Sequence, residues 1–373
     1  MDFALTEAQH DLAELTRRIV TDRVTAERLR EIDAEPDHFD RPLWTELARS
    51  GVLGAGLPAA LGGAGYGLLE ECAVLIEIGR ALAPVPFLPA IVQAGSSFAR
   101  FGTAEQRERW GSATATGELI ATAALAEEDT DHPRAPVTRA KRADGGWRLT
   151  GAKTTVPAGG IAELVVVPAQ TPDGLTVFLV SPEDPGVSLR RQVVVDSDSE
   201  ACLEFDGAWV GSDRVLGEVG QGEPVVGWLL ERGTVGLCAH QLGVAERALE
   251  MTAEYARTRV QFDRAIGTFQ AVSQRLADAY VDVEAIRLTL WQAAWMVSEG
   301  MDADLEVSTA KFWAADAGHR VAHTAVHVHG GVGIDIDYPL HRYFVAAKRN
   351  EFSLGAATAQ LRGVGNVLAT EPA

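Results

Sequence analysis

The chain is poor in cysteine, and this shortage excludes two classes of protein. Its 373 residues include only three cysteines, which lie too far apart to form a paired metal-ligand motif. We therefore expect buried free thiols of a reducing compartment rather than a disulfide framework or a zinc site. The three are Cys72, Cys202 and Cys238.

Basic side chains are also scarce relative to acidic ones. The chain has 33 Lys and Arg against 52 Asp and Glu, a formal net charge of −19. Binding to nucleic acid or to an anionic membrane surface depends on clustered cations that release counterions. The excess of acid therefore argues against both kinds of partner.

Long apolar runs are absent as well. No stretch reaches the roughly 18 uninterrupted apolar residues that a membrane span needs. The first twenty residues, MDFALTEAQHDLAELTRRIV, mix acidic with basic side chains, unlike a signal peptide or a transit peptide. We therefore expect a cytoplasmic protein without a membrane span. Its 47% apolar content is ordinary for a globular chain and suffices for a buried core.

Helical and strand patterns follow one another in three blocks. Residues 1–117 show apolar residues three and four apart, notably from Leu5 to about Arg30, which predicts amphipathic helices. Residues 118–220 contain short β-like runs bounded by Gly, Pro and Asp, which predict an antiparallel sheet or barrel. These runs are LIATAAL, GWRLTGAKTTV, ELVVVPA, GLTVFLVS, VSLRRQVVV and ACLEFDGAWV. Residues 221–373 return to helical spacing. The predicted fold is α+β: an N-terminal helical domain, a central antiparallel β domain and a C-terminal four-helix bundle.

The C-terminal block predicts an up-down bundle, because four stretches keep helical spacing over about 25 residues or more. Several are apolar on more than one face, as in LTLWQAAWMV, which favours contacts between subunits. The four stretches run from about 225 to 257, 269 to 299, 304 to 328 and 339 to 363.

Two segments of this block combine residue types that could carry chemistry. ARTRVQFDRAIGTFQ places Arg259 and Phe262 three residues apart, on one face if the segment is helical. VHVHGGVGIDIDYPLHRY follows His327 and His329 with a glycine-rich turn. Taken alone, the first also suits a helix end with an exposed arginine, and the second a glycine helix cap. A metal held by the two histidines would need a third ligand that the sequence does not offer, so we predict no metal site.

A helical block, a β block ending in LEFDGAWV and a bundle carrying these two segments follow one another in this chain. This order, over essentially the whole length, resembles the acyl-CoA dehydrogenase family. The resemblance implies a tetramer, with FAD lying between the β domain and bundle of one subunit and the bundle of its neighbour. It also implies α,β-dehydrogenation of an acyl-CoA thioester, in which FAD accepts a hydride and a carboxylate removes the α-proton. An electron-transferring flavoprotein is the implied acceptor.

The resemblance assigns bundle residues to an FAD site that is shared between subunits. Arg259 and Phe262 match positions that contact FAD across the subunit boundary, and a guanidinium suits a pyrophosphate. The turn after His327 matches the segment beside the adenosine, where glycine lets the backbone approach. Asp263 stands where the family usually has Gly. The FAD-binding residues implied in this way are Arg259, Phe262, Phe269, Gln270, His327, Val328, His329, Gly330 and Gly331.

The β block departs from the family pattern. LAEEDTDHPRAP replaces the usual Thr-Glu and Gly-Ser-Asp turn, so Ala126 lacks the hydroxyl that the family offers to the flavin. Acidic side chains, Glu127 among them, then stand near a cofactor that carries a pyrophosphate. Thr155 and Pro157 stand where the family has a Trp and a Thr packed on the flavin. We expect an incomplete site for the subunit's own flavin ring.

The catalytic base is missing at both positions where the family carries one. The resemblance puts these positions at Gly233 and Leu354, and neither side chain can remove a proton. Glu351, three residues before Leu354, is the candidate for a displaced base. Its alternative is a helical carboxylate that pairs with Lys348 or Arg349.

Three functions are open from the sequence. The first is an FAD-dependent acyl-CoA dehydrogenase with Glu351 as base. The second is a non-catalytic subunit that completes the FAD site of a second family member in a heterotetramer. It is favoured because the FAD-binding positions of the bundle match the family, whereas those of the β block do not. The third is a flavin enzyme repurposed for chemistry without an α-proton base. The acyl group, straight or bulky and steroid-like, and a homomeric or heteromeric assembly are likewise open.

Overall fold

The computed structural model describes residues 5–196 and 198–370, so the first four residues of the amphipathic N-terminal stretch lie outside the described part. The chain forms two compact units that alternate along the sequence. Unit 1 comprises Met1–Arg28, Leu68–Ala83 and Thr234–Ala373, and unit 2 comprises Leu29–Gly67 and Pro84–Gly233. The three domains predicted from the sequence follow secondary structure rather than contacts, and their limits stay a prediction.

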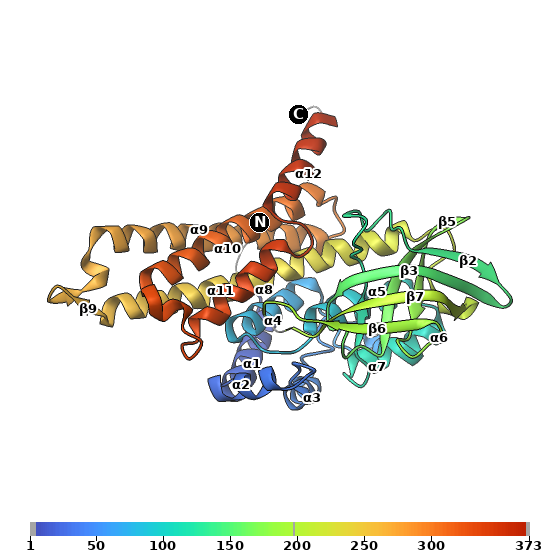
Figure 1. Cartoon of the computed structure of the whole chain (residues 1–373), viewed down its shortest axis with the longest axis horizontal. Helices are drawn as coiled ribbons and strands as arrows, with labels where there is room; N and C mark the ends of the chain where they lie inside the picture. The colour runs from blue at the N-terminus through green and yellow to red at the C-terminus, as the bar shows by residue number, and fades with distance from the viewer. Residues whose placement is uncertain (1–4, 197, 371–373) are drawn as a thin grey trace. The chain divides into compact units, whose positions relative to one another are not determined.

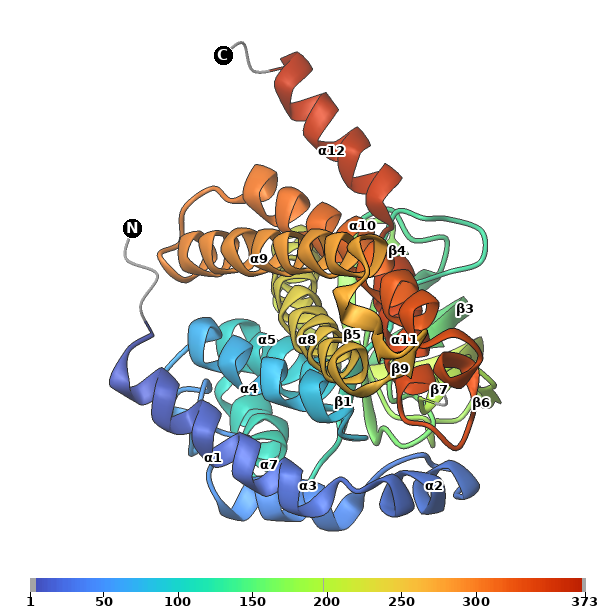
Figure 2. The same cartoon turned by 90° about the vertical axis from the view of Figure 1, so that its left-hand side faces the viewer.

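Unit 1 is built from helices. α1 packs against α4, and α10 packs against α9, α11 and α12. Figure 2 shows α8, α9, α10 and α11 side by side, with α12 extending away from them. Thr6 and Gln9 form the capping box that starts α1. The helices are α1 (Glu7–Arg23), α4 (Leu68–Ala81), α8 (Glu223–Thr258, which begins in unit 2), α9 (Gln270–Ser298), α10 (Asp304–His329), α11 (Leu340–Phe352) and α12 (Ala357–Thr370).

Two stretches predicted as single helices are each divided. The stretch from Leu5 to Arg30 is α1 and the start of α2 (Ala26–Ala34), because Val24 leaves the helical region with φ −89° and ψ 84°. The stretch 339–363 is α11 and part of α12, because Leu354 (φ +55°) and Gly355 (φ +92°) take left-handed backbone angles. A right-handed helix cannot continue through such residues. The prediction of one continuous helix over 339–363 is therefore wrong.

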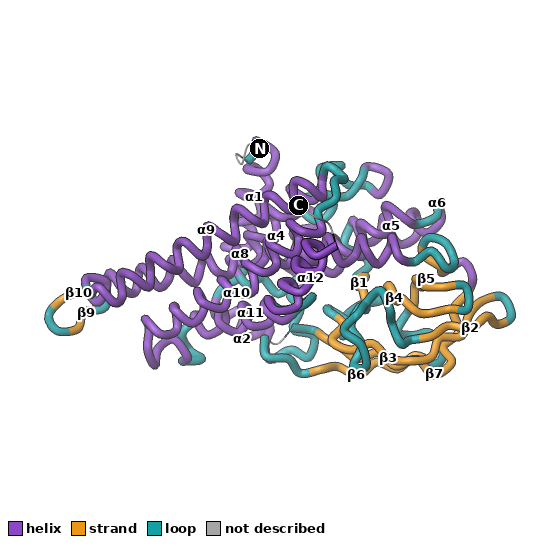
Figure 3. Tube along the Cα trace, turned by 90° about the horizontal axis from the view of Figure 1, so that it is seen from above, coloured by secondary structure: helices purple, strands orange, loops and turns teal. Residues whose placement is uncertain are grey.

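Unit 2 combines short helical segments with a β-sheet, as Figure 1 and Figure 3 show. The sheet has eight strands. The sheet order is β6-β7-β3-β2-β4-β5-β8, with β1 beside β4. Pairing is antiparallel except where β4 meets β1 and β2. The helical segments are α3 (Arg41–Arg49), η1 (Ala59–Leu61), the π-helical η2 (Leu88–Gly95), α5 (Ser96–Phe101), α6 (Ala104–Gln106), the π-helical η3 (Arg107–Gly111), α7 (Ser112–Ala115) and η4 (Ser212–Arg214).

The strands of this sheet lie between Ala121 and Leu216. Each predicted β-like run contains a strand, and GWRLTGAKTTV is β3 from end to end. The run RAKRA escaped prediction because its side chains are charged and only Ala140 is buried. The strands are β1 (Ala121–Ala123), β2 (Arg139–Ala143), β3 (Gly146–Val156), β4 (Leu164–Thr171), β5 (Gly174–Val180), β6 (Val187–Gln192), β7 (Glu200–Gly211) and β8 (Val215–Leu216).

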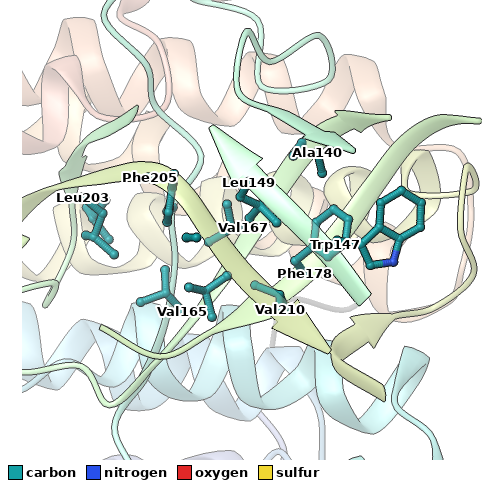
Figure 4. Close-up of a cluster of buried hydrophobic side chains, with 14 of the residues drawn as sticks. Ala140, Trp147, Leu149, Val165, Val167, Phe178, Leu203, Phe205 and Val210 are labelled. Atoms are coloured by element: carbon teal, nitrogen blue, oxygen red, sulfur yellow. The ribbon is translucent and has the colours of Figure 1, made fainter. Parts of the chain in front are cut away.

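The core of unit 2 forms on one face of this sheet. Alternate residues of the strands point inward, as a two-residue period requires. The rings of Trp147 and Phe178 meet edge to face with centroids 5.5 Å apart. Figure 4 shows the cluster, which includes Ala140, Trp147, Leu149, Val165, Val167, Phe178, Leu203, Phe205 and Val210.

Two absences predicted from composition can be compared with this structure. All three cysteines are free and buried, which confirms the prediction of buried thiols. In the described ranges, no helix is long and apolar enough to cross a membrane.

Candidate functional site

The segment expected to contact FAD across a subunit boundary is a β-hairpin. The helix α8 ends just before it, and β9 (Val260–Gln261) pairs antiparallel with β10 (Arg264–Ala265). The segment is therefore not helical, so the condition under which Arg259 and Phe262 would share a helical face is not met. Phe262 and Asp263 form the two-residue turn with φ of +52° and +61°, as a type I′ hairpin turn requires. Figure 3 shows the hairpin beyond the end of α9.

This hairpin exposes groups that the described chain does not use. Phe262 is 87% exposed, and its ring meets the edge of Phe269 at 6.1 Å between centroids. The guanidinium of Arg259 is exposed and makes no hydrogen bond or ion pair with any described residue. A bulky residue at positive φ is strained, and such strain persists at functional sites. Both side chains are available to a ligand or to a neighbouring chain.

The second segment expected to bind FAD lies at the end of α10. His329 is buried, and its ring stacks on Tyr255 of α8 at 4.3 Å. Its Nδ1 lies 2.8 Å from the carbonyl oxygen of Ala325, and its Nε2 lies 3.3 Å from the hydroxyl of Tyr338. Burial lowers the pKa of His329, so the ring is neutral at pH 7. The stacked pair holds this end of α10 against the part of α8 that leads into the hairpin.

The turn after His329 presents bare backbone. Gly330 ends α10 with φ +62°, and no heavy atom lies within 4 Å of a Cβ placed on Gly330 or Gly331. The His327 side chain is exposed and forms no hydrogen bond with the described residues. A ligand can therefore approach the main chain closely here. Because Tyr255 stacks on His329, this turn and the hairpin lie at the same end of unit 1.

Glu351, the candidate for a displaced base, lies in an ion-paired cluster. Its Oε2 is 2.5 Å from Nζ of Lys348 and 3.1 Å from Nδ1 of His319 on α10. Burial raises the pKa of Glu351, but the hydrogen bonds from these two partners outweigh burial, so the pKa lies below its usual range. A carboxylate with a lowered pKa is a weaker general base. The pairing with Lys348 foreseen as the alternative is present.

The two positions matched to the catalytic base differ in their surroundings. Leu354 lies in the turn between α11 and α12 with φ +55°. Gly233 is buried in α8, and a Cβ placed on it would lie 2.2 Å from Nε2 of Gln93. Gln93 is 5% exposed and donates a hydrogen bond to the carbonyl oxygen of Leu229 at 3.1 Å. The space that a side chain at position 233 would enter is therefore filled.

The acidic loop after β1 begins with a buried ion pair. Glu127 and Lys153 meet at 2.7 Å, and their side chains are 3% and 0% exposed. Glu127 also accepts hydrogen bonds from the backbone N–H groups of Val137 and Thr138. Burial raises the pKa of Glu127, but Lys153 and these donors outweigh burial and hold the pKa below its usual range. Glu127 therefore does not offer the free negative charge expected from the sequence.

Two further positions at which the β block departs from the family pattern lie at or just after the end of β3. Thr155 has φ +44°, and its N–H donates to the side-chain oxygen of Gln192 at 2.7 Å. The carbonyl oxygen of Pro157 accepts the hydroxyl of Thr122 at 2.5 Å. Ala126 is exposed. This segment is fixed by contacts within unit 2 and offers a methyl group where a hydroxyl was expected.

A groove of about 790 Å³ opens between α9 and α10 in unit 1. Its charged walls include Arg320, which pairs with Asp282 and Asp316, and it runs from His319 to His327. Within the described residues, no group of three His, Cys, Asp or Glu side chains is arranged to hold a metal ion. Among the described residues, the groove therefore runs beside α10 from His319 to His327 without forming a metal centre.

Comparison with known proteins assigns the chain. The acyl-CoA dehydrogenase N-terminal domain model matches residues 6–118, and the C-terminal domain model matches residues 220–369. The protein described as acyl-CoA dehydrogenase FadE27 of Mycobacterium tuberculosis (strain ATCC 25618 / H37Rv) is 49% identical over 381 residues, with 100% of both chains covered. The chain belongs to the acyl-CoA dehydrogenase family. Members of this family are flavoprotein oxidoreductases that use FAD.

Solved structures confirm the predicted fold. A chain of the ChsE4-ChsE5 complex from Mycobacterium tuberculosis is 50% identical, with a TM-score of 0.95 and 100% of both chains covered. A chain of the Tcur3481-Tcur3483 steroid ACAD G363A variant is 40% identical, with a TM-score of 0.91 and 98% of both chains covered. The chain thus has the acyl-CoA dehydrogenase fold, with an N-terminal helical domain, a central β-sheet and a C-terminal helical domain.

The residues of unit 1 are chemically suited to the FAD that the family uses, whereas those of unit 2 are less so. Unit 1 offers the free guanidinium of Arg259, the exposed ring of Phe262 and the bare backbone at Gly330 and Gly331, which suit a diphosphate and flat rings. Unit 2 offers the methyl group of Ala126 instead of a hydroxyl. The free groups of unit 1 are thus chemically suited to FAD, whereas unit 2 lacks a hydroxyl that the family resemblance led us to expect.

Several functional candidates escaped sequence reasoning. Lys311 is fully buried in the acyl-CoA dehydrogenase bundle and donates to the carbonyl oxygens of Asn350 and Glu351 at 3.0 and 3.1 Å. His319 forms part of the Glu351 cluster, and its spacing of four residues from His323 was a visible signal. Gln93 gave no signal, because its contact with Gly233 joins residues 140 positions apart.

Proposed function

We propose that this chain is the non-catalytic subunit of a heteromeric acyl-CoA dehydrogenase, in which it completes the FAD site of a second family member. The observation that carries the proposal is the state of the two base positions. Leu354 cannot accept a proton, and at Gly233 the side chain of Gln93 fills the space that a carboxylate would need. Because α-proton removal needs a positioned base, dehydrogenation requires another chain to supply it.

The contribution of this chain to the shared site follows from its free groups. The guanidinium of Arg259 would hold the diphosphate of the partner's FAD, because its charge would compensate the phosphate oxygens. The ring of Phe262 would shield the bound cofactor from water. The backbone N–H groups at Gly330 and Gly331 would be open to its polar groups, because no side chain intervenes. FAD supplies the hydride acceptor when bound.

The relatives support a heteromeric assembly. The structures of 50% and 40% identity are described as a ChsE4-ChsE5 complex and a Tcur3481-Tcur3483 protein, and each description names two components. Exposed apolar residues of unit 1, such as Tyr280, Val281 and Leu288 on α9, are the kind that subunit contacts bury. A tetramer of this chain with a second family member accounts for both observations.

Two neighbouring arginines provide a matched test of the contribution to FAD. In the co-purified complex, Arg259→Met is expected to lower the FAD content and to weaken FAD retention on dilution. Arg257→Met is the control, because Arg257 is likewise exposed but pairs with Glu254 at 2.9 Å. Equal FAD retention in the two variants would contradict the proposed role of Arg259.

A second candidate function keeps the chemistry on this chain. Glu351 is the carboxylate nearest in sequence to the matched base position Leu354, and its side chain is 16% exposed. If Glu351 were the base, the chain alone would reduce an artificial acceptor with an acyl-CoA, and Glu351→Gln would abolish that reaction. The ion pair with Lys348 argues against this role, because it stabilises the carboxylate rather than its protonated form.

The proposal extends to substrate and acceptor. The relative described as a steroid ACAD favours an acyl-CoA that carries a bulky fused-ring group over a straight-chain one. Electrons then pass to an electron-transferring flavoprotein, as the family resemblance implies. Comparing turnover of the complex with a steroid side-chain thioester and with octanoyl-CoA tests this extension, and faster turnover of octanoyl-CoA would contradict it.

A further inference from the structure

We infer that Gln93 and Gly233 form an exclusion pair: the Gln93 side chain occupies the position of any side chain at residue 233, so this chain cannot regain a carboxylate there by substitution of Gly233 alone. This inference rests on the proposed function, because it supplies a structural reason why the base must come from a partner. It concerns unit 2 only, since both residues lie in that unit.

A side chain at residue 233 has no room while the Gln93 side chain keeps its present position. A Cβ placed on Gly233 would lie 2.2, 2.9 and 3.3 Å from Nε2, Cδ and Cγ of Gln93. All three distances are shorter than an ordinary van der Waals contact of about 3.5 to 4.0 Å. Gln93 would therefore have to leave its position for any residue larger than glycine. Both residues are buried, so a displaced Gln93 side chain would stay inside the protein.

Gln93 is held in place by its own hydrogen bond. Its Nε2 donates to the carbonyl oxygen of Leu229 at 3.1 Å, four residues before Gly233 in α8. This carbonyl is also the helical acceptor for the N–H of Gly233, so the amide lies directly over the turn that contains the glycine. Displacing Gln93 breaks this hydrogen bond and leaves a buried amide donor without an acceptor, which costs free energy of folding.

The segment around Gln93 is also hydrogen-bonded to α8. Gln93 belongs to η2, a π-helical segment of the kind that often marks functional sites. Immediately after η2, the hydroxyl of Ser96 accepts a hydrogen bond from Nε1 of Trp228 at 2.8 Å. Two hydrogen bonds thus tie this segment to adjacent residues of α8, one from Gln93 to Leu229 and one from Trp228 to Ser96. Gln93 cannot yield by a shift of its backbone without breaking the second contact.

The pair makes a prediction about the partner chain. A family member that carries a carboxylate at the position matching Gly233 needs a side chain shorter than glutamine at the position matching Gln93. A partner sequence with both a glutamine and a glutamate at these positions would overturn the inference.

The decisive experiment is a double-substitution cycle on the full chain, measured by thermal unfolding. We expect Gly233→Ala to lower Tm by several degrees in the natural background and to leave Tm unchanged or higher in the Gln93→Ala background. Gly227→Ala is the control on the same helix, because its Cβ would meet nothing closer than 3.6 Å. That substitution should raise Tm, since alanine is the better helix former. A fall in Tm after Gly233→Ala that is the same in both backgrounds would overturn the inference.

A second variant separates exclusion from a general packing defect. Gln93→Ser shortens the side chain while keeping a polar group, and it should also rescue Gly233→Ala and restore the soluble yield of Gly233→Glu. A Gly233→Glu chain that unfolds at the temperature of the natural protein would contradict the exclusion pair. The cycle does not depend on FAD. If the natural chain alone oxidised an acyl-CoA, the proposed function would be wrong. The double-substitution cycle would still show whether the Gln93 side chain excludes a side chain at residue 233.

Discussion

The buried pair of Glu127 and Lys153 allows a quantitative prediction. Glu127→Ala removes the carboxylate that lies 2.7 Å from an ammonium group with no exposed surface. Breaking a buried pair by removal of one partner costs about 3 to 5 kcal/mol, because the other charge is left uncompensated. The backbone N–H groups of Val137 and Thr138 lose their acceptor as well.

The cost has an upper limit set by titration of Lys153. Burial already lowers the pKa of Lys153, while Glu127 raises it. Without Glu127 the amine can lose its proton instead of remaining charged, and a fall from about 10.5 to pH 7 corresponds to roughly 5 kcal/mol. We therefore expect Glu127→Ala to destabilise the chain by about 3 to 5 kcal/mol at pH 7.

The dependence on pH has a defined sign. In the variant, the pKa of Lys153 is lower in the folded state than in the unfolded state, so the unfolded state binds more protons between the two values. Stability must then rise with pH through that interval, and the defect of Glu127→Ala should shrink as the pH approaches 10. Urea unfolding followed by tryptophan fluorescence measures this, since Trp147 lies on the same strand, β3.

Two controls make this prediction refutable. Glu128→Ala changes the exposed neighbouring carboxylate and should alter stability by less than about 0.5 kcal/mol. The double variant Glu127→Ala with Lys153→Met removes both charges and should recover most of the loss. A loss below about 1 kcal/mol for Glu127→Ala at pH 7 would refute the reasoning.

Three further predictions concern unit 1. Asp263→Gly should strengthen the hairpin, because glycine accepts φ +61° without strain, and slower amide hydrogen exchange in β9 and β10 would show this. Arg80→Met should destabilise the chain by about 2 kcal/mol in urea unfolding, because Arg80 binds both Glu246 and Glu250. Burial lowers the pKa of Lys311 to about 8, so its folded-state pKa lies below the unfolded value. Its contribution to stability should therefore rise by up to about 3 kcal/mol between pH 8 and pH 10.5, and Lys311→Met should lack this rise.

The order of helices and strands could be predicted because periodicity is local. The run GWRLTGAKTTV predicted β3 in full, since alternation and bounding glycines act within a dozen residues. The division of the 339–363 stretch could not be foreseen, because Leu354 is an ordinary helix former that here takes φ +55°. The hairpin at Phe262 was missed for a related reason, since aromatic and acidic residues seldom occupy both turn positions.

The candidate site was only partly predictable. The family resemblance assigned Arg259 and the turn after His327 to FAD binding, because the matching segments are contiguous in the sequence, and this assignment stays a prediction. The charge of Glu127 was misjudged, since its partner Lys153 lies on another strand and is invisible to a linear pattern. The Gln93 contact depends on tertiary packing alone, so only the fold could disclose it.

We propose above all that this chain contributes to FAD binding but does not itself catalyse dehydrogenation. The most direct measurement is the FAD-to-chain ratio and acyl-CoA-dependent acceptor reduction of the chain purified alone and together with its partner. Our account predicts a colourless, inactive chain alone and a yellow, active complex with fewer FAD molecules than chains. About one FAD per chain with turnover in the absence of a partner would contradict it.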